Sequence, residues 1–378
     1  MKKILFFFLV FCTLCTSGSE ITRQTLNDLL GIPLFTSEKT WSKNALQQRL
    51  KLRLTGNNRR FSTRFNRNIA GAKPVELEIH TADDNDTVTI ISVTYANQGD
   101  SQENYKTLIR DTGRTISKRM NNCGKKIKGG FSDGVFKIKG DLWQTKYARF
   151  VLEMDKGDFV LFHILPPEGL KKTTDPGKKD FSKNVKRNNF GDVWIPNVPM
   201  VDQGPKGYCV PATMTRIFLY YGIHMDMHHM AKMGNTGRGE KEGTFLHIIF
   251  KEINQLRRDA RLKMKEISSI SIKNIARCID KGHPVFWIIY KDPGKAYAFS
   301  NANRSKAATP EIWNRKLKKF SISSFPKSDH VLLIIGYNEK TEEIAVSNSW
   351  GENHIKPTWI QLKIAQRVTS GNLVVFSP

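Results

Sequence analysis

Residues 203–222, which read QGPKGYCVPATMTRIFLYYG, decide the fold of the C-terminal half of this chain. A turn rich in glycine leads to Cys209, and an apolar run typical of a helix follows from Val210 to Tyr221. Gly222 is a natural residue to end that helix, and Pro211 stands in the first turn, where no N–H is needed. The stretch predicts a cysteine at a helix start, where the helix field favours a thiolate.

Two later stretches supply groups that a reactive thiol needs. His330 begins an apolar strand, and Asn348 ends the following strand, after a connection that reads as a hairpin. A histidine placed there can take the proton of the Cys209 thiol, and an amide carbonyl can fix the tautomer of the imidazole. We therefore expect His330 as the base and Asn348 as the group that orients it.

Gln203 and Trp350 complete the candidate site. The side-chain amide of Gln203 and the backbone N–H of Cys209 can together hold an oxyanion. Trp350 can cover the bond between His330 and Asn348. Each residue has an ordinary structural alternative, such as an exposed loop glutamine or a core histidine, but their order along the chain favours a catalytic site.

The order of these residues resembles the papain-like cysteine peptidases, with the run Asn348-Ser349-Trp350-Gly351 at its end. Other segments are similar to the bacteriocin-processing (double-glycine) peptidase-like branch of that superfamily: Gly207–Thr213, Tyr220–Gly222 and Gly282–Val285. That branch typically orients its histidine with an aspartate, where this chain has Asn348. The resemblance covers residues 190–378 and implies a papain-like fold, peptide-bond hydrolysis, a peptide or protein substrate and no cofactor.

Composition divides the chain into two parts. Residues 166–189 are rich in Pro, Gly, Lys, Asn and Asp and lack apolar periodicity, which is typical of a linker. Residues 19–165 predict a small α+β domain of unknown role, with a helix over 105–120 and several short strands. Residues 190–378 predict helices followed by antiparallel strands, so the fold class expected for the whole chain is α+β.

The N-terminus predicts export. Lys2 and Lys3 precede an apolar run of the length found in signal peptides, and small residues near Gly18 mark the expected cleavage site. The run is too short to span a bilayer. We expect residues 1–18 to be removed and the protein to be secreted or periplasmic. Cys123 and Cys278 remain beside Cys209, and the sequence leaves open whether they pair or stay buried.

The formal net charge is +25, with basic residues scattered along the chain. No nucleic-acid-binding module is present in the sequence, so no specific nucleic acid binding is expected. Contact with an acidic polymer or a membrane surface is compatible with the charge, as is simple solubility. His224, His228 and His229 suggest a metal site, but the alternating methionines favour packing, and we expect no metal.

Two other functions stay open at this stage. The same thiol site could serve an acyltransferase or a deamidase, because an amine can capture an acyl-enzyme in place of water. The basic N-terminal half could instead make this a surface-binding protein with a silent site. The glycine-rich loop 234–243 reads as a substrate-lining or a plain surface loop. Residues 19–165 could also be an inhibitory pro-region released by cleavage in the linker.

Overall fold

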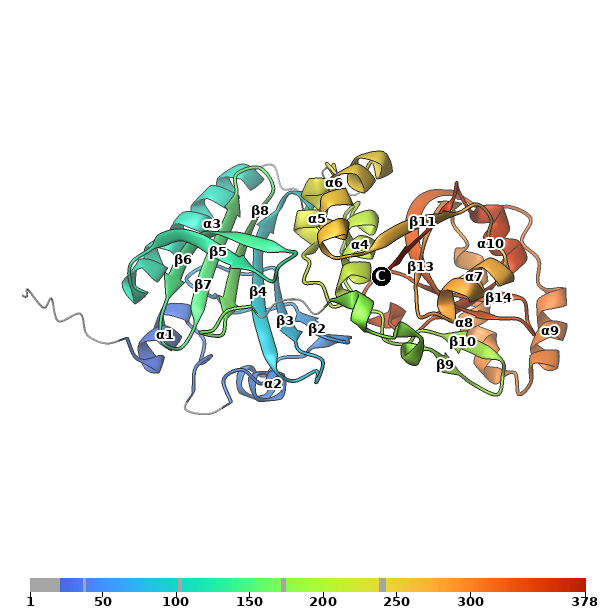
Figure 1. Cartoon of the computed structure of the whole chain (residues 1–378), viewed down its shortest axis with the longest axis horizontal. Coiled ribbons are helices and arrows are strands. Elements are labelled where there is room, and N and C mark those ends of the chain that lie inside the picture. Colours follow the sequence, from blue (N-terminus) through green and yellow to red (C-terminus); the bar gives the residue numbers. More distant parts are fainter. Residues whose placement is uncertain (1–20, 37–38, 101–103, 171–174, 238–242) are drawn as a thin grey trace, which may run out of the picture.

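A computed structural model describes residues 21–36, 39–100, 104–170, 175–237 and 243–378 (Figure 1). The predicted export signal and the middle of the glycine-rich loop lie outside the described residues. Two antiparallel sheets, one from each half of the chain, lie on either side of a group of helices. Among the described residues no helix is both long and apolar enough to cross a bilayer.

The N-terminal sheet has the strand order β1-β2-β3-β4-β8-β7-β6-β5. Its strands are β1 Thr55–Asn57, β2 Arg60–Thr63, β3 Glu76–Thr81, β4 Val88–Asn97, β5 Ile127–Ser132, β6 Lys137–Gln144, β7 Arg149–Asp155 and β8 Phe159–Leu165. Three helices join the same core: α1 Arg23–Leu30, α2 Lys43–Leu50 and α3 Tyr105–Met120. Every neighbouring pair of strands is antiparallel, so the chain runs back and forth across this sheet.

Strand alternation separates the two faces of this sheet. Leu77 and Ile79 of β3 pack in the core shared with α1, α2 and α3. Their neighbours in sequence, Glu78 and His80, point to the opposite face because successive side chains alternate along a strand. These polar side chains are buried, and His80 Nε2 lies 3.0 Å from Glu78 Oε2. The polar side chains on this face of β3 therefore contact protein rather than water.

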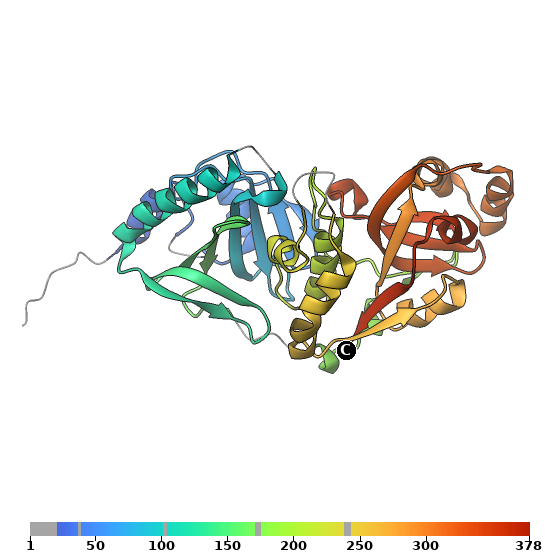
Figure 2. The same ribbon diagram turned by 90° about the horizontal axis from the view of Figure 1, so that it is seen from above.

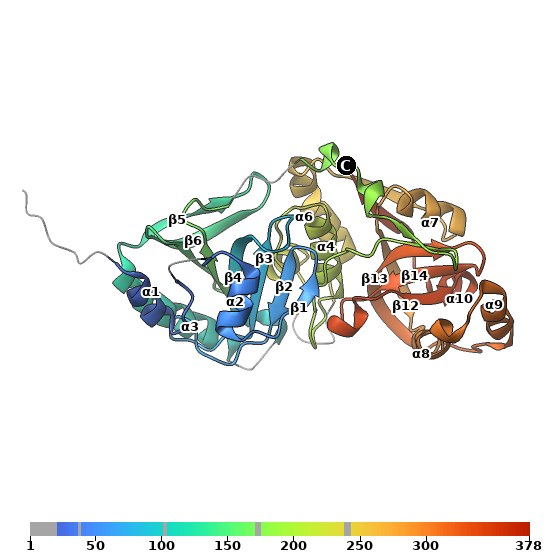
Figure 3. The same cartoon turned by 90° about the horizontal axis from the view of Figure 1, so that it is seen from below.

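The helices α4 Cys209–Tyr220 and α5 Met227–Met233 cover that polar face, and α6 Leu246–Asp259 packs on α5. Figures 1, 2 and 3 each show this group between the two sheets. His229 of α5 lies 2.9 Å from Glu153 of β7 and 3.3 Å from Asp226. Both carboxylates raise the pKa of His229 to about 9 despite the opposing effect of burial, so His229 is a cation in this interface. The two halves of the chain are thus joined by buried, paired charges.

The C-terminal sheet has the order β11-β16-β12-β13-β10-β9, with β14 paired to β13 and β15 paired to β14. Its strands are β9 Lys186–Arg187, β10 Asp192–Trp194, β11 Lys263–Ile267, β12 Val285–Lys291, β13 Lys327–Asn338, β14 Glu343–Ser347, β15 Thr358–Gln361 and β16 Leu373–Ser377. The remaining helices pack around it: α7 Ile272–Ile279, α8 Gly294–Asn303, α9 Pro310–Lys319 and α10 Leu362–Val368. The predicted α+β fold class is confirmed.

The segment that composition marks as a linker is packed in part. Phe181 is buried, and its ring lies 5.4 Å from that of Tyr220 and 4.9 Å from that of Tyr221. A Cβ at Gly282, whose φ is +75°, would meet the carbonyl of Phe181 at 2.0 Å. The aromatic side chain of Phe181 therefore packs this part of the segment directly against the C-terminal half.

Candidate active site

Helix α4 begins at Cys209, as residues 203–222 predict. Tyr208 is the N-cap residue, and every residue from Val210 to Tyr220 is buried. A helix buried on all sides has no freedom to rotate, because the N-terminal sheet and β13 both pack against it. Cys209 itself is half-buried, so the thiol stands at the end of a fixed element and is still partly exposed.

The sulfur of Cys209 lies beside the start of β13. The backbone N–H of Val331, in β13, lies near enough to the Cys209 thiol to act on its pKa, which it lowers. One turn further along α4, the hydroxyl of Thr213 donates to the carbonyl of Val331 at 3.5 Å. Because Val331 follows His330 directly, these contacts place Cys209 and His330 on the same side of the molecule.

His330 is held by Asn348, which directly follows β14. Nε2 of His330 lies 2.8 Å from Oδ1 of Asn348. The backbone N–H of Ser349 also donates to this oxygen, at 2.8 Å, so Oδ1 accepts and Nε2 of His330 must carry the proton. In the neutral ring this leaves Nδ1 of His330 as the basic nitrogen. β13 and β14 are paired neighbours, as the predicted hairpin requires.

Trp350 covers the imidazole of His330. The two rings are stacked, with centroids 4.9 Å apart and an angle of 22° between their planes. The ring of His354 is nearly perpendicular to that of Trp350, with 5.4 Å between the centroids. Trp350 is still 46% exposed, so it covers the histidine from the solvent side.

Gln203 is fixed by the same run of residues that holds the histidine. Its Oε1 accepts from the hydroxyl of Ser349 at 2.7 Å, and its backbone N–H donates to the carbonyl of Ser349 at 2.9 Å. Its Nε2 donates one hydrogen to the carbonyl of Lys206 at 3.1 Å. The structure therefore brings Gln203, Cys209, His330 and Asn348 into one region, joined through the bonds of Ser349 and the contact of Val331.

Burial opposes the helix field at the thiol. It raises the pKa of Cys209 above its ordinary value, and Asp329 acts in the same direction. The backbone N–H groups of Val331, Val210 and Cys209 itself oppose this rise without cancelling it. The resting group is therefore a thiol at neutral pH, which differs from the thiolate that the sequence predicts. Desolvation of the first turn, which the local sequence does not reveal, is the reason.

Burial also lowers the pKa of His330, against the opposing effects of the bond to Asn348 and of Asp292. The imidazole is therefore neutral at pH 7 and able to accept a proton. A neutral thiol beside a neutral base suits a proton transfer that accompanies attack on the substrate rather than a stable ion pair.

Arg216 connects α4 to the end of β14, and the sequence did not predict this role. It is buried in α4, and it donates to the carbonyl of Pro199 at 2.8 Å and to the carbonyl and hydroxyl of Ser347 at 3.3 and 2.5 Å. Ser347 directly precedes Asn348, so Arg216 fixes the end of β14 relative to the helix that carries the thiol. A single charged residue within the apolar run 210–221 was the available signal.

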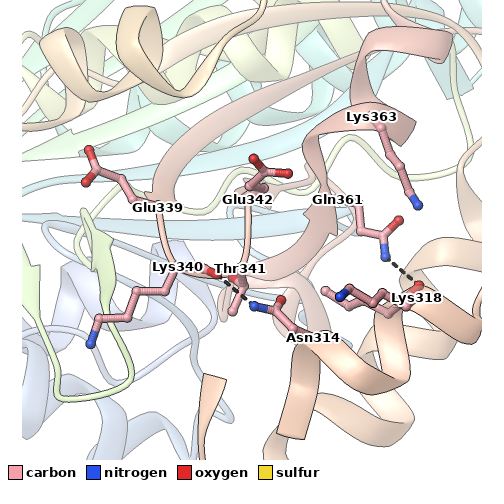
Figure 4. A pocket seen from close by; sticks show the side chains of 9 residues that line it. Asn314, Lys318, Glu339, Lys340, Thr341, Glu342, Gln361 and Lys363 are labelled. Atoms are coloured by element: carbon pink, nitrogen blue, oxygen red, sulfur yellow. Dashed lines mark hydrogen bonds between the residues drawn. The ribbon is translucent and has the colours of Figure 1, made fainter. Parts of the chain in front are cut away.

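A pocket of about 350 Å³ lies at the turn between β13 and β14 (Figure 4). Its lining mixes both charges, and two bonds shape it: Asn314 to the carbonyl of Lys340 at 2.8 Å, and Gln361 to the carbonyl of Leu317 at 3.1 Å. Strand β13 places this turn roughly 30 Å from His330, at about 3.3 Å per residue. The pocket is therefore separate from the candidate site.

Residues 195–366 match the Peptidase_C39 like family. Solved structures similar to this chain include a C39-like protein from Bacillus anthracis (14% identity, TM-score 0.34, covering 50% of this chain and 98% of that one). Others are the peptidase domain of ComA from Streptococcus (12%, 0.30, 47% and 97%) and xylellain, a cysteine protease from Xylella fastidiosa (14%, 0.28, 52% and 88%). Among curated proteins, none matches this sequence.

The family match covers the region that holds all four candidate residues, from Gln203 to Asn348. It agrees with the papain-like, double-glycine branch that the sequence resembles. The match over residues 195–366 therefore supports a cysteine peptidase of the Peptidase_C39 like family in the C-terminal half of the chain.

Proposed function

We propose that this protein is an exported cysteine peptidase that hydrolyses peptide bonds with Cys209 as nucleophile, His330 as base and Asn348 as the group that orients the base. The bond between His330 Nε2 and Asn348 Oδ1 carries the proposal, because it leaves Nδ1 as the basic nitrogen. The backbone N–H of Val331, the residue that follows His330, acts on the Cys209 thiol, which supports the proposal by bringing the thiol to the same part of β13.

In this mechanism Nδ1 of His330 takes the thiol proton as the sulfur of Cys209 attacks the substrate carbonyl. The second hydrogen of Gln203 Nε2 and the backbone N–H of Cys209 stabilise the oxyanion that forms. The imidazolium then gives its proton to the leaving amine, and a thioester remains on Cys209. Water, activated by the same imidazole, attacks the thioester and releases the acid and the free thiol.

Selective alkylation tests the nucleophile. Iodoacetamide should abolish hydrolysis of a fluorogenic peptide in step with one adduct per chain, which mass spectrometry should locate at Cys209. Burial raises the pKa of Cys123 to about 12 and also raises that of Cys278, so both thiols should react slowly with iodoacetamide at neutral pH. Loss of activity that follows an adduct at Cys278, or full activity with Cys209 alkylated, contradicts the proposal.

Product analysis separates hydrolysis from acyl transfer or deamidation. With a primary amine added to the assay, a peptidase should still release mainly the free acid, and mass spectrometry should show the cleaved peptide. An amide product in excess of the acid, or a change of one mass unit without cleavage, indicates the transferase or deamidase alternative. Cys209→Ala should remove any of these activities but not binding to a surface.

The pH dependence of hydrolysis should reflect the lowered pKa of His330. A base works only when it is unprotonated, so activity is lost as the pH falls through its pKa. Because burial holds the pKa of His330 below 6.5, the acid limb of kcat/KM should lie below pH 6.5. Asn348→Ala removes a bond that raises this pKa, so the limb should move further down while kcat falls. An acid limb centred above pH 6.5 contradicts this assignment.

Export is part of the proposal and rests on residues 1–18. The mature mass of the protein recovered outside the cytoplasm should correspond to cleavage near Gly18. A protein that keeps its first residues, or that stays in the cytoplasm, contradicts this part alone.

A further inference from the structure

The short loop between Gln203 and Cys209 contacts the N-terminal half of the chain. A 3₁₀ turn, Gln98–Asp100, follows strand β4 directly, and its carboxylate reaches this loop. Nζ of Lys206 lies 2.8 Å from Oδ1 of Asp100, and the side chain of Lys206 is only 8% exposed. A buried ammonium needs a paired anion, so Lys206 depends on a residue more than 100 positions away in sequence.

The backbone of the same turn packs on the loop. A Cβ at Gly99 would lie 2.6 Å from the ring of Tyr208 and 2.7 Å from Cδ of Lys206, so no larger residue fits without displacing them. Nζ of Lys206 also lies 5.5 Å from the centroid of the Tyr208 ring. Tyr208 is the residue that precedes the nucleophile and caps its helix.

Lys206 is held at its other end by the proposed oxyanion donor. Its carbonyl accepts from Nε2 of Gln203 at 3.1 Å and from the N–H of Tyr208 at 2.7 Å. Its own N–H donates to the carbonyl of Gly204 at 2.9 Å. Ser349 holds Oε1 of the Gln203 amide, and the carbonyl of Lys206 holds its Nε2, so the direction of the amide depends on Lys206, which is paired with Asp100.

We propose that Asp100 is a positioning residue for catalysis, which acts through Lys206 to aim the Gln203 amide at the oxyanion, and that the N-terminal half is a permanent part of the active peptidase. This inference rests on the proposed function. It assigns residues 21–165 a role in building the active site and rejects a pro-region that must be removed.

The rest of the interface supports a permanent union. The guanidinium of Arg60 in β2 is buried, paired with Glu78, and donates to the carbonyl of Met200 at 2.8 Å. Asn57 makes two further bonds to the same segment, to the carbonyl of Val198 at 3.0 Å and from the N–H of Met200 at 2.9 Å. Val198 and Met200 lead directly into the Gln203 loop, so both ends of this loop are tied to the N-terminal half.

Asp100→Asn tests the inference in the full-length protein. With a fluorogenic peptide, kcat should fall by about tenfold or more while KM stays nearly constant, because an oxyanion donor acts in the transition state. Alkylation of Cys209 by iodoacetamide has no carbonyl oxyanion, so its rate should stay unchanged. Asp111→Asn on α3 is the matched control, since the Asp111 side chain is 56% exposed, and it should leave kcat unchanged.

A double-mutant cycle shows whether the effect of Asp100 on kcat passes through Gln203. If Asp100 acts through Gln203, adding Asp100→Asn to Gln203→Ala should lower kcat by no more than about twofold beyond Gln203→Ala alone. If the two substitutions lower kcat independently, so that their effects multiply in the double variant, the inference is overturned. A wild-type kcat in Asp100→Asn also overturns it. If Gln203→Ala and Cys209→Ala also retain activity, the proposed function itself fails. Thermal unfolding of each variant shows whether the fold persists at the assay temperature.

The intact mass of the active protein tests the second part. Protein that hydrolyses the peptide and carries the adduct at Cys209 should retain residues 21–165. Activity found only in a species that has lost this half, with the full-length form inactive, overturns it.

Discussion

His330→Ala is expected to lower kcat/KM for peptide hydrolysis by roughly 10⁴- to 10⁶-fold, the range found when the base of a nucleophile–base pair is removed. The loss should be large because the Cys209 thiol has a raised pKa and is almost fully protonated at neutral pH. Without an adjacent base, the proton has no route off the sulfur as attack begins. Cys209→Ala should give a loss of the same size.

Steady-state kinetics with a fluorogenic peptide near neutral pH measures the effect, and the double variant Cys209→Ala/His330→Ala should be no worse than either single one. His247→Ala is the matched control, because His247 is exposed on α6. Cys278→Ala is the matched control for Cys209→Ala. If His330→Ala keeps more than about a hundredth of the activity, another group is the base.

Arg216→Met is expected to lower the free energy of unfolding by about 3 kcal/mol. The change leaves three buried acceptors, on Pro199 and Ser347, without their donor, and each such loss costs about 1–3 kcal/mol. Removing a buried charge offsets part of this, since burial lowers the pKa of Arg216 to about 9. Arg216→Lys should recover little, because one ammonium cannot reach three acceptors in a fixed fork.

Urea denaturation measures this change as a lower midpoint at constant slope. Arg315→Met on α9 is the control, since Arg315 is exposed, and its midpoint should stay within error of wild type. Arg216→Met should also lower kcat in the folded protein, because Ser347 positions Asn348. A variant as stable as wild type shows that the guanidinium contributes no net stability.

The helix at Cys209 and the strand pair of His330 and Asn348 could be predicted because their signals are local. The apolar run after Cys209 matches α4, and the expected helix over 105–120 matches α3 in both bounds. α9 was missed although Thr309 and Pro310 form a clear helix start. The sequence did not predict β5, because it is a largely exposed edge strand whose side chains show no alternation of buried and exposed positions.

Contacts between the two halves could not be predicted from the sequence. The alternation of β3 indicates that Glu78 and His80 share a face, but not that α5 covers it. The ion pair of Asp100 and Lys206 depends on how the two halves of the chain pack, and no local sequence pattern predicts that packing. The same limit applies to the thiol of Cys209, whose desolvation is a property of the assembled fold.

The position of α4 and α5 between two sheets has a consequence for the order in which the chain folds. Strands β1 to β8 are contiguous in sequence, so the first sheet can close before the later residues have left the ribosome. The folded first sheet then offers a surface against which α4, the helix that begins at Cys209, can pack. We expect the second half, synthesised alone, to need a chaperone or to aggregate.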